Sequence, residues 1–187
     1  GAPPGPAPLI PRVSKGPSGM LTILILTLFP VLMAYAALSD VLTMTISNWV
    51  SIILVAAFCV LALWTSMPLD EFAWDVSCAF TVLCVTFLFF ARGWIGGGDA
   101  KLASATALWM GWENLDQYSM LFALFGGVLT LVILYFRFAP MPAFVDTFAW
   151  MRRLRDKANG VPYGVALASA GLMVYPQTSL WLSVAVS

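Results

Sequence analysis

Histidine is absent from this sequence of 187 residues. Zinc proteases of the HExxH type, Ser-His-Asp hydrolases and Cys-His proteases all need an imidazole as ligand or base, so these classes are excluded. Charge is also scarce, because charged residues make up 10% of the chain and the net charge is zero. Nothing here forms the basic face that a nucleic-acid partner requires, so we expect no nucleic-acid partner.

Cysteine is rare as well. The three cysteines, Cys59, Cys78 and Cys84, lie in apolar runs and form no CxxC pair. They are typical of core or lipid-facing positions and predict neither a zinc site nor a disulfide framework. We therefore expect no metal and no cofactor. Any chemistry has to use Asp, Glu, Lys, Tyr, Ser or Cys side chains.

Apolar residues dominate what remains. They make up 61% of the sequence, and the mean hydropathy is +0.91, well beyond the range of soluble domains. About 20 apolar residues cross a bilayer as a helix, and the runs predict an all-α, polytopic membrane bundle of about six transmembrane helices. The candidate spans are Leu21 to Leu38, Trp49 to Trp64, Trp74 to Ala91, Ala100 to Trp112, Tyr118 to Phe138 and Val161 to Val186.

Two of these spans are irregular. The fourth is too short to cross a bilayer without the glycines before it, so we expect "GGGD" to lie at membrane depth, where irregular backbone must be buried or line a wet cavity. The sixth contains Pro162 and Pro176, which predict a kink or a broken end. Residues 1–19 are rich in Pro and Gly and are interpreted as a disordered tail or an expression remnant, which leaves 20–187 as one membrane-embedded domain.

Basic residues predict the orientation. With six spans, the loops 40–48, 92–101 and 139–160 share one face, and that face holds seven of the nine Lys and Arg residues. The positive-inside rule places it in the cytoplasm. Within 139–160, Phe144, Phe148, Met151 and Leu154 fall at helical spacing among cations. Either an amphipathic helix on the inner leaflet, near anionic lipids, or a solvated connecting helix fits this pattern.

Nine acidic residues are present, and most have ordinary explanations. Seven are assigned to the loops: Asp70, Glu71, Asp75, Glu113 and Asp116 on the outer side, Asp146 and Asp156 on the inner side. Asp40 remains, near the C-terminal end of a helix, where the macrodipole disfavours a negative charge. Asp99 also remains, inside "GWIGGGDAKL" at the start of the fourth span.

Asp99 could simply cap that helix. A cap, however, does not require three glycines. Gly96, Gly97 and Gly98 permit positive φ angles and let another backbone or a substrate come close. An ionisable residue at membrane depth is also a candidate functional residue. These features favour an active-site loop.

Both aspartates follow odd-numbered spans, so both lie at the cytoplasmic edge and could meet across the bundle. Two facing carboxylates that share a proton can activate water, one as general base and the other as general acid. Asp40 and Asp99 are therefore the predicted catalytic pair. Lys101 either tunes this pair or extends its ammonium to the membrane surface, and we favour the second.

These motifs resemble a known family. "GGGDAKL" contains the Gly-x-Gly-Asp signature of intramembrane aspartyl proteases and is similar to the second active-site motif of type IV prepilin peptidases. "DVLTMTISN" resembles the first motif of that family, with Ser47 where Pro is usual. "VPYGVALASAG" is similar to the motif that opens its last helix. The three occur in the right order from Met20 onward.

The resemblance implies a bacterial or archaeal enzyme of the cytoplasmic membrane that cuts the leader from prepilins or pseudopilins after a Gly. It implies Asp40 and Asp99 as catalytic residues, with Gly96, Gly97, Gly98 and Lys101 around the scissile bond. The chain is similar to the short, peptidase-only members associated with tight-adherence (Flp) pili, the TadV/CpaA kind. Archaeal preflagellin peptidases share this chemistry and are a near alternative.

Two other hypotheses stay open. A small transporter or pilus-assembly subunit could use the same aspartates to bind a cation or relay protons. A presenilin-like protease would share the pair but cut within the membrane span of its substrate.

Overall fold

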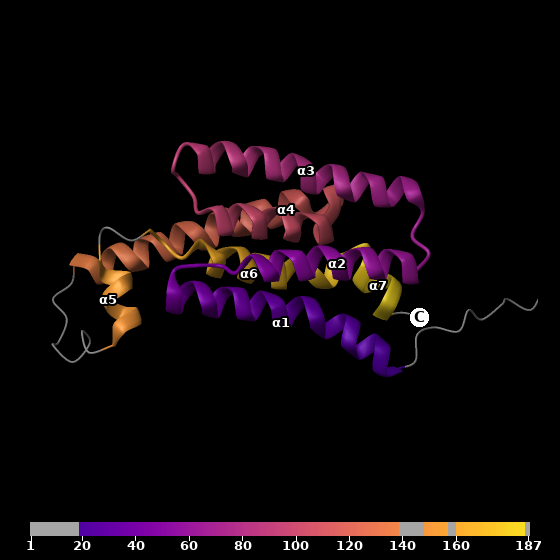
Figure 1. Ribbon diagram of the computed structural model, residues 1–187, viewed down its shortest axis with the longest axis horizontal. Coiled ribbons are helices and arrows are strands. Elements are labelled where there is room, and N and C mark those ends of the chain that lie inside the picture. Colours follow the sequence, from indigo (N-terminus) through magenta and orange to yellow (C-terminus); the bar gives the residue numbers. More distant parts are fainter. Residues whose placement is uncertain (1–18, 139–147, 157–159, 186–187) are drawn as a thin grey trace, which may run out of the picture.

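The computed structural model describes residues 19–138, 148–156 and 160–185, and every regular element within them is helical (Figure 1). The all-α prediction is therefore confirmed for these residues. The elements are α1 (Gly19–Thr43), α2 (Asn48–Trp64), α3 (Leu69–Ala91), α4 (Gly97–Phe138), α5 (Ala149–Arg155), α6 (Tyr163–Val174), the 3-10 turn η2 (Tyr175–Gln177) and α7 (Ser179–Ala185).

The helices run up and down the long axis of the molecule (Figure 1). The end of α1, the start of α2, the end of α3 and the start of α4 all lie toward the left of this view, together with α5. We call this the α5 end of the bundle and the other the α7 end. Of the loops predicted to share one face, the described residues 40–48, 92–101 and 148–156 lie at the α5 end.

Helix α4 is broken at Gly111, which has φ 62° and ψ 179° inside a run of 42 residues. Only glycine adopts this backbone without strain. The helix starts near the end of α3 and finishes beside α5, both on the left of Figure 1, so its two halves run in opposite directions. They correspond to the predicted fourth and fifth spans, although helix begins at Gly97 rather than Ala100.

The first half of α4 forms the centre of the bundle. Its residues from Ala100 to Gly111 are almost all buried, against α2, α3 and α6, and side chains of α1 also reach them. An aromatic cluster closes the α7 side of this core: the ring of Phe29 lies 4.4 Å from that of Tyr175 and 5.1 Å from that of Trp109, between ring centres. Trp109 also donates its indole N–H to the carbonyl of Leu54 at 3.1 Å. The helix that carries Asp99 is thus held on several sides.

The outer surface is strongly apolar. Leu63, Trp74, Phe80 and Leu131 are among many large hydrophobic side chains more than half exposed, which a soluble surface avoids. Among the described residues, α3 and α4 are long and apolar enough to cross a membrane, whereas α2 and residues 27–43 of α1 are apolar but shorter. These features indicate a membrane protein, while the number of crossings stays a prediction.

The predicted interruption of the last span is confirmed. Pro162 precedes the first residue of α6, where its missing N–H has no cost, and α6 ends at Val174, two residues before Pro176. The chain then makes the 3-10 turn η2 before the short α7.

The predicted amphipathic helix is only partly seen. Helix α5 has seven residues and ends in Arg152, Arg153 and Arg155. Phe148 precedes it and is exposed, and Phe144 lies outside the described residues, as do Asp146 and residues 1–18. Its contact with lipid stays a prediction.

The prediction that places the acidic residues in outer loops is wrong. The acidic residues assigned to the outer loops belong to α3 and α4, because helix continues where short loops were expected. Asp75 in particular is buried, with 8% of its surface exposed, and its carboxylate faces the break at Gly111. Ser47 precedes α2 as the cap residue, but its side chain makes no capping hydrogen bond.

Candidate active site

Asp40 lies in the last turn of α1 and is buried, with 5% of its surface exposed. Its Oδ2 accepts a hydrogen bond of 2.7 Å from the backbone N–H of Gly164, in the first turn of α6. The positive end of the α6 dipole therefore faces this carboxylate. A carboxylate that is unfavourable on its own helix is stabilised by the N-terminus of another.

Gly164 makes this contact possible. A Cβ atom at this position would lie 2.7 Å from Asp40 Oδ2 and 2.7 Å from Ile46 Cδ1. Neither separation leaves room for a methyl group. The glycine of the "VPYG" motif is therefore required because α1 and α6 approach each other closely.

Asp99 occupies the first turn of α4. Its Oδ2 accepts a hydrogen bond of 3.2 Å from the backbone N–H of Gly96, just before the helix, as the acidic residue of a capping box does. Its other oxygen, Oδ1, is buried and has no hydrogen-bond partner. Capping thus accounts for one carboxylate oxygen and leaves the second unexplained.

The two aspartates come together at the α5 end. Asp40 and Ile46 both reach Gly164, and Gly98, the residue before Asp99, lies against Ile46. Ile46, in the segment between α1 and α2, touches the neighbours of both. A Cβ at Gly98 would lie 3.1 Å from Ile46 Cβ, and the Ile46 side chain also reaches Gly164. The ends of α1, α4 and α6 therefore converge around one residue.

The three glycines act through close approach rather than through unusual backbone angles. Positive φ among the described glycines occurs at Gly93 and Gly111, and not at Gly96, Gly97 or Gly98, so that part of the prediction is wrong. A Cβ at Gly96 would lie 3.0 Å from Asp99 Oδ2. Gly97 and Gly98 begin the helix and lie against Phe90 and Ile46.

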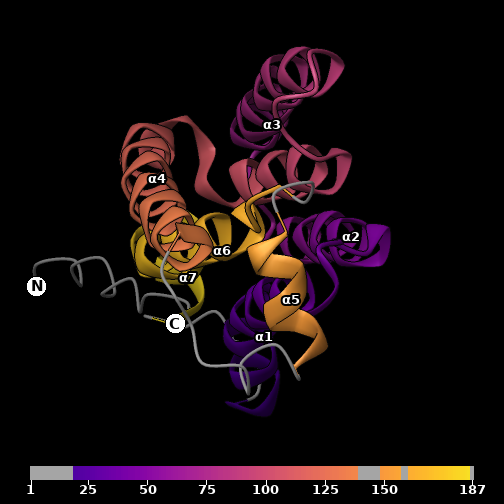
Figure 2. The ribbon, with the colours of Figure 1, turned by 90° about the vertical axis from the view of Figure 1, so that its left-hand side faces the viewer.

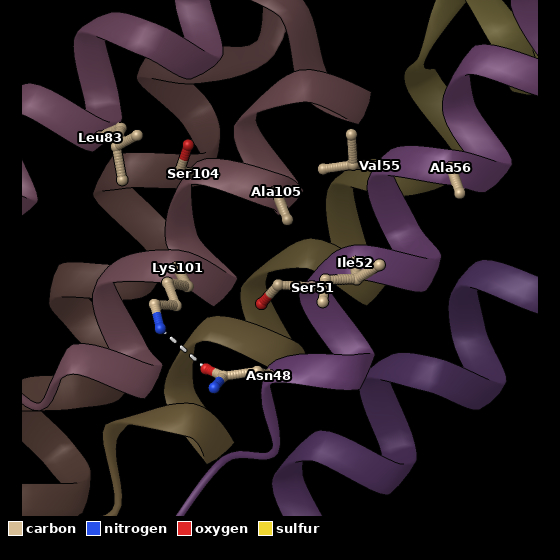
Figure 3. A pocket seen from close by; sticks show the side chains of 9 residues that line it. All are labelled: Asn48, Ser51, Ile52, Val55, Ala56, Leu83, Lys101, Ser104 and Ala105. Atoms are coloured by element: carbon tan, nitrogen blue, oxygen red, sulfur yellow. Dashed lines mark hydrogen bonds between the residues drawn. The ribbon is translucent and has the colours of Figure 1, made fainter.

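Lys101 points away from the carboxylates. Its Nζ donates a hydrogen bond of 2.8 Å to Asn48 Oδ1 at the start of α2 (Figure 3). Positions two apart on a helix face nearly opposite directions, so Asp99 and Lys101 serve different sides of α4. Lys101 lines a cavity of about 590 Å³ instead.

Basic residues fasten α5 beside the site. Arg153 donates to the carbonyl of Leu42 at 2.7 Å, in the last turn of the helix that carries Asp40. Arg137, near the end of α4, donates to the carbonyls of Leu154 and Gly160 at 2.9 and 3.0 Å. Figure 2, viewed from the α5 end, shows α5 lying across the bundle near α1.

Sequence reasoning missed two parts of the site. Ile46 lies in a motif in which Asp40 is the predicted functional residue, and Arg153 lies in a segment predicted to be a surface or connecting helix. No pattern identifies either, because each acts through a contact distant in sequence. Among the described residues, no cluster of three or more His, Cys, Asp or Glu side chains could hold a metal.

The fold and the site define a class: an all-helical membrane protein with two aspartates near each other at one end of its bundle. The sequence model of the type IV leader peptidase family matches residues 27–135, more than half of the chain. The chain belongs to this family. Searches of curated proteins and of solved structures gave no significant match.

The matched region contains Asp40, Asp99 and the three glycines, and it ends before Gly164. Membership supports a leader peptidase function in general and prepilins in general as substrates. The third motif lies outside the match, yet its Gly164 is bound to Asp40.

Proposed function

We propose that this protein is an aspartic endopeptidase that removes the leader of prepilins or pseudopilins, with Asp40 and Asp99 as its catalytic pair. The observation that carries the proposal is that the ends of α1 and α4 that hold these two aspartates meet around Ile46. The buried, unpartnered Oδ1 of Asp99 supports it further, because such an atom is expected to bind water or substrate.

The proposed reaction follows from two carboxyl groups that share one proton. The ionised carboxylate takes a proton from water as the water oxygen attacks the scissile carbonyl carbon. The protonated carboxyl group donates its proton to the carbonyl oxygen, which gives a tetrahedral diol. When the C–N bond breaks, a proton passes to the leaving nitrogen, so the products are a free carboxyl and a free amine.

Backbone groups of the site fit this mechanism. The N–H of Gly164 holds one Asp40 oxygen and that of Gly96 holds one Asp99 oxygen. Each aspartate thereby keeps its orientation while its other oxygen is available for water and proton transfer. No cofactor and no metal takes part in this proposal.

We further propose a multi-pass arrangement of six crossings in a bacterial or archaeal cytoplasmic membrane. α1, α2, α3, the two halves of α4, and α6 with α7 would supply the crossings. The site would face the cytoplasm, since Arg92, Arg137 and the three arginines of α5 cluster at the same end. Those arginines would also contact anionic lipid head groups.

The proposed substrates are Flp-like prepilins cut after a Gly, as in the short, peptidase-only members that the motifs resemble. The test is cleavage of a co-expressed prepilin by the parent chain, by Asp40→Asn and by Asp99→Asn, read as a gel shift and by N-terminal sequencing. We expect the parent chain to cut after a Gly and both variants to lose cleavage.

Retention of cleavage by either variant would contradict the catalytic pair. If several prepilins stay uncut by a folded parent chain, a cation- or proton-handling membrane protein becomes the better hypothesis. A cut within the apolar segment of the substrate would instead indicate the presenilin-like alternative.

A further inference from the structure

A lateral groove opens beside the site, on the opposite side of α4. Helices α2 and α3 both pack against α4 but have little contact with each other, which leaves α4 as the floor between them (Figure 2). The cavity of about 590 Å³ lies there. It is lined by Asn48, Ser51, Ile52, Val55 and Ala56 of α2, Leu83 of α3, and Lys101, Ser104 and Ala105 of α4.

The groove follows the helix axes. Its α2 residues recur at helical spacing over more than two turns, so they form one face of that helix (Figure 3). Its floor is made of small side chains such as Ser104 and Ala105, which allow another helix to approach closely. The shape suits an extended or helical chain lying along the bundle rather than a compact solute.

The polar groups of the groove gather at the α5 end. Lys101 and Asn48 form its mouth, linked by their hydrogen bond of 2.8 Å. Ser51 lies one helical turn further in and is 8% exposed, and its hydroxyl has no hydrogen-bond partner. A buried hydroxyl without a partner is costly, and this one belongs to the wall of a cavity. It indicates that an occupant supplies the missing hydrogen bond.

We propose that this groove receives the apolar helical segment of the peptide substrate, with its polar end at Lys101 and Asn48. This inference rests on the proposed function. Lys101 is two residues from Asp99, in the first turns of the same helix, so a chain that lies in the groove and continues around the start of α4 reaches the catalytic pair. Lys101, Asn48 and Ser51 are positioning residues that hydrogen-bond carbonyl or carboxylate oxygens of the substrate.

A peptide fits these observations better than a lipid tail does. An acyl chain has no atom that could accept or donate a hydrogen bond at Ser51, whereas a peptide carbonyl keeps a second lone pair even inside a helix. The single cation at the mouth also complements an acceptor at one end of an otherwise apolar segment.

The experiment compares two adjacent isoleucines of α2. Ile52 lines the groove and Ile53 does not, yet both are exposed, at 54% and 41%. Ile52→Trp and Ile53→Trp are assayed in detergent with a full-length prepilin whose cleavage by the parent chain is measured first. We expect Ile52→Trp to raise KM about tenfold, or about 1.4 kcal/mol, with little change in kcat, and Ile53→Trp to match the parent.

A crosslinking measurement covers the case in which Ile52→Trp does not fold. A photoreactive phenylalanine derivative is placed at 52 or at 53 in the uncleaving Asp99→Asn chain and irradiated with the same prepilin. We expect a crosslink to the apolar segment of the prepilin from 52 and not from 53. Crosslinks only to lipid, or equal yields from both positions, would overturn the inference.

The outcomes also separate this inference from the proposed function. If the parent chain cleaves and the two tryptophan variants have equal KM values, the proposed role of the groove is rejected and the proposed peptidase function is retained. Absence of any cleavage by the parent chain rejects the peptidase first. Lys101→Met should raise KM as Ile52→Trp does. Lys101→Arg should have a KM close to that of the parent chain, because the donor and the charge are kept.

Discussion

The two ends of the bundle each bury an aspartate against a glycine, but the two arrangements differ. At the α5 end, Asp40 is bound by the backbone N–H of Gly164 and lies near the start of the helix that carries Asp99. At the α7 end, Asp75 lies against Gly111, where a Cβ would be 2.5 Å from its Oδ1. Glu71 and Glu113 act on it electrostatically.

Burial of a carboxylate therefore does not identify a catalytic residue. Gly111 marks the break that lets α4 turn back, and Asp75 fills the space that the missing side chain leaves. Gly164 instead brings the N-terminus of α6 to the Asp40 carboxylate. We infer a structural role for Asp75 and a chemical role for Asp40.

The largest expected difference between the ends is in activity. Asp99→Asn should lower the rate of prepilin cleavage by at least about a thousandfold, because residues that act as a unit fail together. Asp75→Asn should stay within about threefold of the parent, since an amide of the same shape still fills the space beside Gly111. Initial rates on one prepilin, at equal amounts of folded protein, measure both. A comparable loss in Asp75→Asn would remove the distinction drawn here.

Gly164→Ala should be the next most damaging change. The added methyl group would lie 2.7 Å from Asp40 Oδ2, so the carboxylate or α6 must shift and the hydrogen bond weakens. We expect a fall of about tenfold to a hundredfold in kcat, since small displacements of catalytic groups have effects of this size.

Gly127→Ala is the matched control for that change. Gly127 lies in the second half of α4, and a Cβ there would meet nothing within 4 Å. The cleavage activity of Gly127→Ala should equal that of the parent chain. A large loss in the control, or none in Gly164→Ala, would show that close packing around Asp40 does not matter for cleavage.

Gly111→Ala should affect stability rather than chemistry. Its φ of 62° and ψ of 179° lie in a region that is essentially restricted to glycine and costs other residues about 1–3 kcal/mol, and the methyl group would also collide with Asp75. We expect a lower midpoint of thermal unfolding in detergent, with a nearly normal kcat for the protein that stays folded. An unchanged midpoint would contradict the role given to the break.

The smallest expected effect is that of Trp112→Phe. The indole N–H of Trp112 donates a hydrogen bond of 2.9 Å to Ser77 Oγ, which joins α4 to α3 just after the break. Its loss should lower the free energy of unfolding by about 1 kcal/mol and leave cleavage unaffected. The same thermal assay, with Trp49→Phe as the comparison, measures it, because Trp49 is mostly exposed. Equal shifts in the two variants would argue against the hydrogen bond.

The helices were predictable from the sequence because long apolar runs and Pro punctuation act locally. The prolines around α6 show this, since both interrupt the helix where ring geometry requires it. The catalytic pair could be proposed because two carboxylates stood out among apolar residues. The family match contains both of them, although their roles remain proposals.

Other features could not be predicted because they depend on contacts between distant segments. A glycine within a helical pattern does not reveal a φ of 62°, so the break at Gly111 was not foreseen. The sequence predicts a loop position for Asp75. Its burial cannot be predicted locally, because it comes from α4, about 35 positions away. The glycines before Asp99 were correctly expected to allow close approach, but their backbone angles depend on Phe90 and Ile46.

The break in α4 also bears on how the protein is made. A straight helix of 42 residues would be about 63 Å long, roughly twice the hydrocarbon thickness of a bilayer. With the break, residues 97–138 would insert as one helical hairpin. The two halves would then pack against each other as they enter the bilayer. Asp99 would reach its final depth only after the ribosome has released Phe138, so assembly of the catalytic pair would be a late event in biosynthesis.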